Sequence, residues 1–163
     1  MSLGRALVLT ISDSASAGKR DDLSGPEAGR ILEEAGFEVA AVEVLPDERA
    51  NIESRLQKAS GEGFRLVVTT GGTGLSPRDV TPEATLAVID RQVPGIAELM
   101  RRESLKITPR AALSRAVSGI RQSTLIINLP GSVKGVRECL GAVRPILAHA
   151  VEVLQQSSLG CGE

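Results

Sequence analysis

Aromatic residues are almost missing from this chain. Its 163 residues include two phenylalanines, Phe37 and Phe64, and no tryptophan or tyrosine. Proteins that bind single-stranded nucleic acid stack the bases on aromatic side chains, so this class is nearly excluded. The formal net charge of −1 points the same way, because nucleic-acid-binding domains carry a basic surface. A planar heterocycle bound here must be held by aliphatic side chains and backbone.

Histidine and cysteine are also scarce. His149 is the only histidine, so a two-histidine metal site is excluded and any catalytic triad would depend on this residue. It lies in an apolar helical pattern, which favours a side chain that packs against the core or extends into solvent over a catalytic base. The two cysteines, Cys139 and Cys161, match no zinc or redox motif. We therefore expect free thiols in a reducing cytoplasm.

Long apolar runs are absent too. No stretch of 18 apolar residues, secretory signal or lipidation motif is present, so we expect a cytoplasmic protein without membrane contact. Hydrophobic residues make up 42% of the chain and charged residues 24%, the balance of an ordinary globular domain. We expect a single domain over residues 1–163, with a flexible tail at 157–163.

The most informative stretch runs from Leu66 to Thr85. Residues 66–70 form an apolar, β-branched run typical of a buried strand. Gly71, Gly72 and Gly74 follow in a glycine loop, which permits a sharp turn close to a ligand. Thr81, Pro82 and Glu83 then predict a helix with Thr81 as its N-cap. This order of strand, glycine loop and helix start binds anions well. Asp79 within it would repel a phosphate unless a metal ion lies between them.

The glycine loop belongs to neither common nucleotide-binding type. No lysine follows it, as a P-loop requires. Pro77 stands where the dinucleotide fingerprint has its third glycine, which excludes a nicotinamide-dependent enzyme. A plain structural turn remains an alternative. The neighbouring Arg78 and Asp79 favour a phosphate or nucleotide site.

Apolar strands and amphipathic helices alternate along the rest of the chain. Strands are predicted at 5–11, 38–45, 66–70 and 123–129, and helices beginning near Ser24, Glu48, Thr81, Pro94 and Val133, with Pro145 breaking or restarting the last. The pattern predicts an α/β fold in three layers, with a mostly parallel sheet flanked by helices.

Polar residues follow several predicted strands. Ser12 and Asp13 follow the first strand, Asp47 the second, and Asn128 lies at the last strand–turn junction. Ligands of open α/β sheets bind at the carboxyl ends of strands, so these are candidate site residues. A turn role for Asp13 and a helix N-cap role for Asp47 remain open. The basic run at 104–119 is either a solvated face or the lining of an anion site.

Several motifs together resemble the molybdenum-cofactor biosynthesis domain family, which includes bacterial adenylyltransferases of the MogA type, MoaB proteins and the G domains of gephyrin-like proteins. The match extends from about Leu7 to Leu154. It is carried by Thr69-Thr70-Gly71-Gly72-Thr73-Gly74, Pro77-Arg78-Asp79-Val80-Thr81-Pro82-Glu83-Ala84-Thr85, Ile11-Ser12-Asp13, Ser24-Gly25-Pro26, Leu45-Pro46-Asp47-Glu48, 103–109, Leu113-Ser114-Arg115 and Ile126-Ile127-Asn128-Leu129-Pro130-Gly131.

The resemblance implies a molybdopterin adenylyltransferase that uses ATP and Mg²⁺, forms a homotrimer and passes its product to a molybdenum-insertion protein. It implies catalytic and metal-binding roles for Asp47 and Asp79. The implied ligand-binding residues are Asp13 and Asn128 near the nucleotide, Gly71, Gly72, Thr73 and Gly74 in the phosphate loop, and Ser114 and Arg115 beside the pterin. A MoaB-type molybdopterin-binding protein and a non-catalytic scaffold module remain alternatives.

Overall fold

The computed structural model describes residues 1–159, with side chains as far as residue 156. Its centre is a six-stranded sheet of order β2-β1-β3-β6-β5-β4. The four predicted strands are confirmed and lie parallel: β1 (Arg5–Ile11), β2 (Glu38–Leu45), β3 (Leu66–Thr70) and β6 (Thr124–Leu129). Two short strands that the sequence did not reveal, β5 (Ser118–Arg121) and β4 (Arg91–Gln92), add an antiparallel edge.

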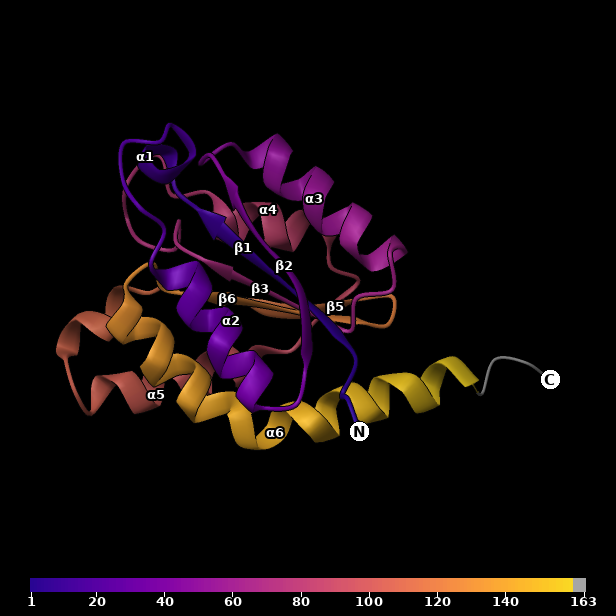
Figure 1. Cartoon of the computed structure of the whole chain (residues 1–163). Coiled ribbons are helices and arrows are strands. Elements are labelled where there is room, and N and C mark those ends of the chain that lie inside the picture. The colour runs from indigo at the N-terminus through magenta and orange to yellow at the C-terminus, as the bar shows by residue number, and fades with distance from the viewer. Residues whose placement is uncertain (160–163) are drawn as a thin grey trace.

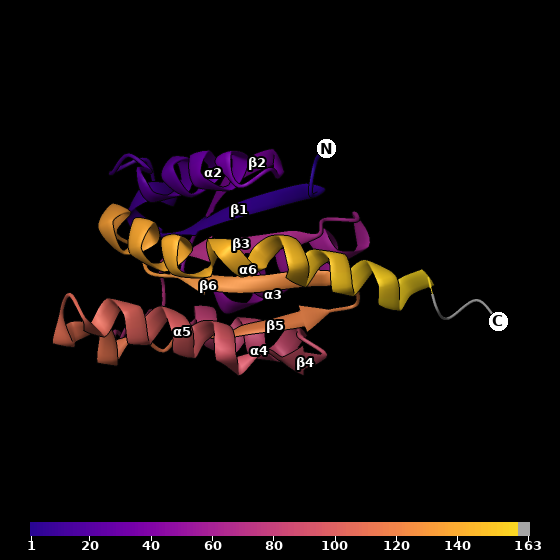
Figure 2. The same ribbon diagram turned by 90° about the horizontal axis from the view of Figure 1, so that it is seen from below.

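Helices cover both faces of the sheet and make the predicted three-layer α/β fold (Figures 1 and 2). One face carries α2 (Ser24–Glu34), α5 (Pro94–Leu105) and α6 (Val133–Leu159), and the other carries α3 (Arg49–Gly61) and α4 (Thr81–Val88). Strand β1 shows why both faces need cover. Ala6 and Val8 belong to the first buried cluster, whereas Leu7 and Leu9 belong to the second.

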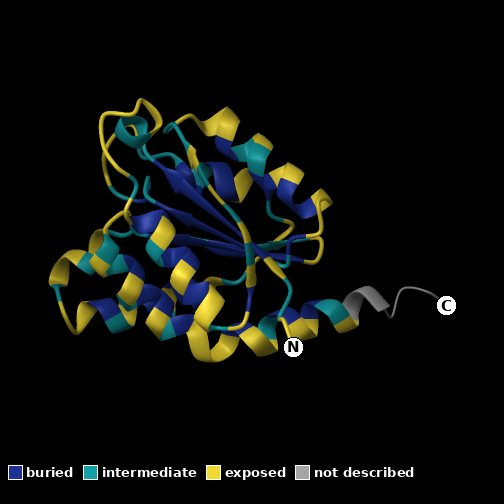
Figure 3. Ribbon diagram, viewed as in Figure 1, coloured by how far each residue is buried: buried dark blue, intermediate teal, exposed yellow. Residues whose placement is uncertain are grey.

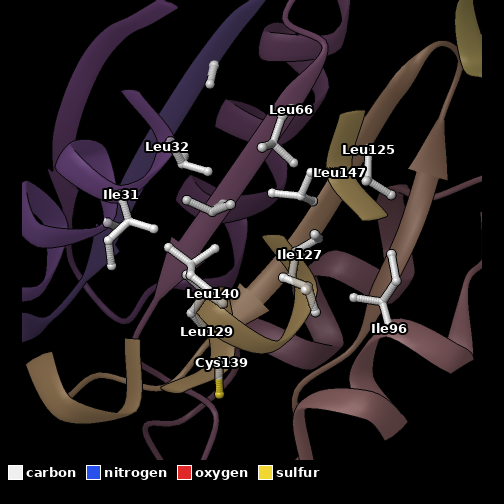
Figure 4. Close-up of a cluster of buried hydrophobic side chains, with 14 of the residues drawn as sticks. Ile31, Leu32, Leu66, Ile96, Leu125, Ile127, Leu129, Cys139, Leu140 and Leu147 are labelled. Atoms are coloured by element: carbon white, nitrogen blue, oxygen red, sulfur yellow. The ribbon is translucent and has the colours of Figure 1, made fainter. Parts of the chain in front are cut away.

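The apolar core lies along the central strands and the inner sides of the helices, while the outer sides of the helices are exposed (Figure 3). Figure 4 shows the larger cluster, in which Leu140 and Leu147 of α6 face Ile127 of β6. Cys139 is buried in the same cluster as a free thiol, as predicted. Cys161 lies outside the described residues. Across residues 1–159, no helix has the length and apolarity needed to cross a bilayer.

Helix α6 departs from the prediction at Pro145. It continues unbroken from Val133 to Leu159, so the break at Pro145 was wrong. Pro145 lies on the exposed side of the helix, where water can bond the carbonyl that loses its usual partner. The flexible tail predicted from Ser157 is helical as far as Leu159, and residues 160–163 lie outside the described part.

Candidate active site at the carboxyl ends of the parallel strands

The carboxyl ends of the four parallel strands meet at one edge of the sheet, and the polar loops predicted from the sequence gather there. Strand β1 leads into the short helix α1 (Asp13–Ser16), visible beside the strand ends in Figure 1. Strand β2 ends before Asp47, and β3 leads directly into the glycine loop. Parallel pairing therefore brings together segments that are distant in sequence.

The glycine loop adopts a backbone that only glycine tolerates easily. Gly71 and Gly72 have φ angles of 94° and 68°. A Cβ on Gly71 would lie 2.3 Å from the carbonyl oxygen of Ile11, and one on Gly72 would lie 2.2 Å from the Thr81 hydroxyl. The loop is thus packed tightly against β1 and α4 and leaves no room for a side chain at either glycine.

Thr81 does not cap α4, so that prediction was wrong. Thr81 is the first helical residue and Val80 occupies the N-cap position without a side-chain bond. The Thr81 hydroxyl instead donates to the carbonyl oxygen of Gly71 at 3.0 Å, and its amide donates to that of Gly72 at 3.2 Å. Thr81 therefore ties the glycine loop to the helix start.

Asp47 does not cap α3. The N-cap of α3 is Glu48, which makes no side-chain capping bond. The Oδ2 atom of Asp47 accepts from the amide of Asp13 at 2.9 Å. Its Oδ1 atom lies 3.1 Å from where a Cβ of Gly72 would be. The N-cap alternative for Asp47 is therefore wrong, and the carboxylate faces the glycine loop.

The environment of Asp47 disfavours its charge. Burial raises the pKa of its carboxyl above the usual value. The hydrogen bond from the Asp13 amide opposes this rise, and the negative charges of Asp13 and Asp79 add to it. A carboxyl group whose ionised form is disfavoured in this way is typical of a functional site.

Asp79 lies against Gly74 of the glycine loop. Its Oδ2 atom accepts from the amide of Ser76 at 3.1 Å and would be 2.9 Å from a Cβ on Gly74. Among residues 1–156, no group of three or more His, Cys, Asp or Glu side chains is arranged to hold a metal ion. Two carboxylates nevertheless suit Mg²⁺, which keeps several waters and takes its remaining ligands from substrate phosphates.

Arg78 joins Asp13 to the segment that carries Asp79. Its Nε and Nη2 atoms each donate to the Asp13 carboxylate at 2.9 Å, and Nη2 also reaches Glu48 at 3.3 Å. This paired bond holds the pKa of Asp13 below its usual value, with help from the Asp47 amide. Asp13 is therefore both a helix-start residue, in α1, and part of the site's charged cluster.

Asn128 lies beneath the loop and has no exposed surface. Its Nδ2 atom donates to the hydroxyls of Thr69 at 3.0 Å and Thr85 at 2.9 Å, and its Oδ1 atom accepts from the Val117 amide at 3.2 Å. All its side-chain polar atoms are thus bonded within the protein. Asn128 links β3, α4 and β6 below the site and does not reach its surface.

Two cavities open on either side of the loop 130–132. One has a volume of about 330 Å³, and its lining includes Thr73, Gly74 and Ser114 from the predicted set together with Thr108, Arg110 and Lys134. The other, of about 450 Å³, is lined in part by Ser12, Asp22, Ser24, Gly71, Gly131 and Ser132. The glycine loop contributes to both walls, so ligands in the two cavities would approach each other there.

Sequence reasoning missed some of these lining residues. Asp22 accepts from the Thr10 hydroxyl at 2.7 Å and from the Gly25 amide at 2.9 Å, which fixes the start of α2. Asp22 could have been identified in the sequence as an acidic residue shortly before a predicted helix start. Ser24, near which this helix was predicted to begin, is its first residue, and Leu23 is the N-cap.

Comparison with known proteins gives a consistent assignment. The family model described as a probable molybdopterin binding domain matches residues 7–149. The chain is 48% identical over 150 residues to a molybdopterin adenylyltransferase of Helicobacter pylori strain J99, covering 90% of this chain and 85% of that protein. It is 45% identical over 157 residues to gephyrin of Dictyostelium discoideum, covering 90% of this chain but only 22% of that longer protein.

A solved structure supports the same family assignment. The molybdopterin biosynthesis enzyme MoaB from Thermus thermophilus superposes with a TM-score of 0.87 at 52% identity, covering 92% of this chain and 95% of that one. The match thus extends over nearly the whole of both chains. The chain belongs to the molybdopterin-binding domain family of molybdenum cofactor biosynthesis.

Proposed function

We propose that this protein is a molybdopterin adenylyltransferase. A terminal phosphate oxygen of molybdopterin attacks the α-phosphorus of ATP, the bond to the β-phosphate oxygen breaks, and adenylylated molybdopterin and pyrophosphate result. The observation that carries the proposal is the placement of Asp47 and Asp79 against one glycine loop that walls two cavities. The names of the bacterial relatives support it.

This reaction needs no general base from the protein. A phosphate monoester has its second pKa near 6, so the nucleophile is already charged at pH 7. His149 is exposed on α6, about 24 Å along the helix from its first residue at the usual rise per residue. Its distance from the site supports a mechanism without histidine, in which positioning and charge stabilisation supply the rate.

Asp47 and Asp79 would hold Mg²⁺ in this scheme. Bound Mg²⁺ neutralises phosphate charge as the reaction proceeds. The raised pKa of Asp47 fits such a role, because a nearby cation relieves the repulsion among the acidic side chains. The chain itself fixes both carboxylates through the amides of Asp13 and Ser76.

The remaining predicted residues would contact the substrates or support the loop. Gly71, Gly72, Thr73 and Gly74 present backbone at the start of α4, where anions bind favourably. We assign Asp13 to the nucleotide side and Ser114 to the pterin side. Asn128 serves the nucleotide side indirectly, through its bonds to Thr69 and Thr85.

We also infer the cellular setting from the family resemblance. The protein would work in the cytoplasm as a homotrimer and pass its product to a separate molybdenum-insertion protein. Exposed apolar side chains at Leu105, Ile107 and Leu113 are compatible with self-association. Light scattering after size exclusion would measure the number of subunits.

Incubation of the purified protein with molybdopterin, ATP and Mg²⁺ tests the activity directly. We expect adenylylated molybdopterin and one pyrophosphate per pterin, and no product after chelation of Mg²⁺. The alternatives are a MoaB-type molybdopterin-binding protein, whose resemblance to this chain is supported by the Thermus MoaB structure, and a non-catalytic scaffold module. Tight pterin binding without product under any divalent metal would establish one of these alternatives.

A further inference from the structure

Arg115 lies against the segment that carries Asp79. Its Nε atom donates to the carbonyl oxygen of Gly74 at 2.7 Å, and its Nη2 atom donates to that of Asp79 at 2.8 Å. The main-chain amide of Arg115 also donates to the carbonyl oxygen of Thr73 at 2.9 Å. One residue therefore holds both ends of the turn between Gly74 and Asp79.

The guanidinium of Arg115 is itself fixed in place. Its Nη1 atom forms an ion pair with Glu83 in the first turn of α4. Although burial opposes its ionisation, the hydrogen bond from Arg115 keeps the pKa of Glu83 below its usual value. From the other side, Arg101 donates to the carbonyl oxygens of Ser114 at 3.3 Å and Ala116 at 2.9 Å. The side chain and its backbone are both anchored.

The guanidinium donors of Arg115 are taken up by groups of the protein itself. Its neighbour Ser114 lines the smaller cavity, whereas Arg115, like Asp47 and Asp79, lines neither of the two beside the loop. Its charge is paired with Glu83, and its Nε and Nη2 atoms are occupied by carbonyl oxygens. A planar guanidinium can satisfy these three acceptors in fixed directions, which the single ammonium of lysine cannot.

We propose that Arg115 is a positioning residue that sets the orientation of the Asp79 carboxylate and does not bind substrate. The turn that it holds contains the Ser76 amide, whose bond at 3.1 Å orients Asp79. Loss of the Arg115 contacts would let this turn move and displace the carboxylate. The catalytic part of this inference rests on the proposed function of Asp79.

Replacement of Arg115 by lysine tests the proposal, with Arg121→Lys as the matched control. Arg121 also donates to a carbonyl oxygen, that of Val88 at 2.8 Å, and to the Ser60 hydroxyl at 3.1 Å. It pairs with Thr124 at the opposite edge of the sheet from the site. Both variants keep a positive charge and lose guanidinium bonds to the backbone, so they separate a local effect from a general loss of stability.

Three measurements decide the outcome. In Arg115→Lys we expect faster amide hydrogen exchange in the peptide 75–80, turnover at saturating substrates lower by about tenfold or more, and a molybdopterin Kd within about twofold of wild type. In Arg121→Lys all three should match wild type. Glu83→Gln should change exchange in the same direction by a smaller amount, because only the Nη1 contact weakens.

Two results would overturn the proposal. A weaker molybdopterin Kd with unchanged exchange would make Arg115 a ligand-binding residue. Unchanged exchange and unchanged turnover would leave it without a positioning role. Exchange and pterin binding are measured without catalysis, so a wild-type protein that makes no product would refute the proposed function while the exchange data still decide whether Arg115 holds the turn.

Discussion

Asp13 and Asp47 exchange hydrogen bonds. The amide of Asp13 donates to Oδ2 of Asp47 at 2.9 Å, and the amide of Asp47 donates to Oδ1 of Asp13 at 3.0 Å. The two residues follow the carboxyl ends of β1 and β2, so the exchange joins these strand ends. It also keeps two carboxylates close together, an arrangement that costs free energy unless a cation is near.

Replacing Asp47 with asparagine should preserve the fold and remove the activity. The amide oxygen of asparagine can still accept from the Asp13 amide, while a charge that is unfavourable at this position disappears. Because the pKa of Asp47 is raised in the folded state, the folded protein favours the protonated form, and this preference destabilises the fold as pH rises through that pKa. At pH 7 without Mg²⁺ we expect an equal or higher Tm and a turnover lower by about 10²-fold. A lower Tm with normal turnover would make Asp47 a structural residue.

Replacing Asp79 with asparagine should reduce turnover more than pterin binding. The variant keeps the acceptor for the Ser76 amide but loses the charge that would hold Mg²⁺. Turnover should fall by about 10²-fold or more. Molybdopterin affinity should stay the same or rise, because one negative charge facing the phosphate is gone. Near-normal turnover would instead show that Asp79 only shapes the loop, since asparagine is a comparable turn residue.

Turnover should change little between about pH 7 and 9, because the phosphate nucleophile is already ionised in this range. The variant His149→Ala should have the same pH–rate profile, since His149 is exposed on α6 away from the site. Steady-state rates at saturating ATP and molybdopterin would measure both profiles. A single ionisation near pH 6.5 that is lost in the variant would make His149 catalytic.

Replacing Asn128 with alanine should destabilise the fold. The hydroxyls of Thr69 and Thr85 and the amide of Val117 would lose their bonds in a site closed to water. We expect a loss of about 2–3 kcal/mol in the free energy of unfolding, or about 4–12 °C in Tm for a domain of this size. Thermal unfolding beside the exposed control Asn51→Ala, expected within about 0.5 kcal/mol of wild type, would measure it. Equal Tm values for the two variants would contradict the bonding role of Asn128.

The sequence predicted the parallel strands because each is a nearly continuous apolar run. It did not predict β5, which is short and partly polar. The hairpin from β5 to β6 turns at Gln122, which has a φ of 53° where asparagine or glycine is usual. The amide of Gln122 donates to Asp90 at 2.6 Å, a contact between residues far apart in sequence that no local pattern reveals.

In the candidate site, too, some residues could be predicted from the sequence and others could not. Strand position made Asp47 a candidate, because parallel pairing brings the ends of β1 and β2 together. The glycine-loop motif made Asp79 a candidate. The partners of Thr81 and Arg115 could not be predicted from the sequence, because each depends on the folded path of the glycine loop. Local propensity favours Thr81 as a helix cap, and the packing of Gly71 and Gly72 against α4 overrides it.

The fate of labelled phosphorus tests the central claim most directly. The protein would be incubated with molybdopterin, Mg²⁺ and ATP labelled at either the α- or the γ-phosphorus, and the pterin product isolated. The account predicts one label per pterin from α-labelled ATP, and none from γ-labelled ATP, whose label leaves with pyrophosphate. Transfer of the γ-label to the pterin, or a bound pterin that acquires no label from either ATP, would contradict it.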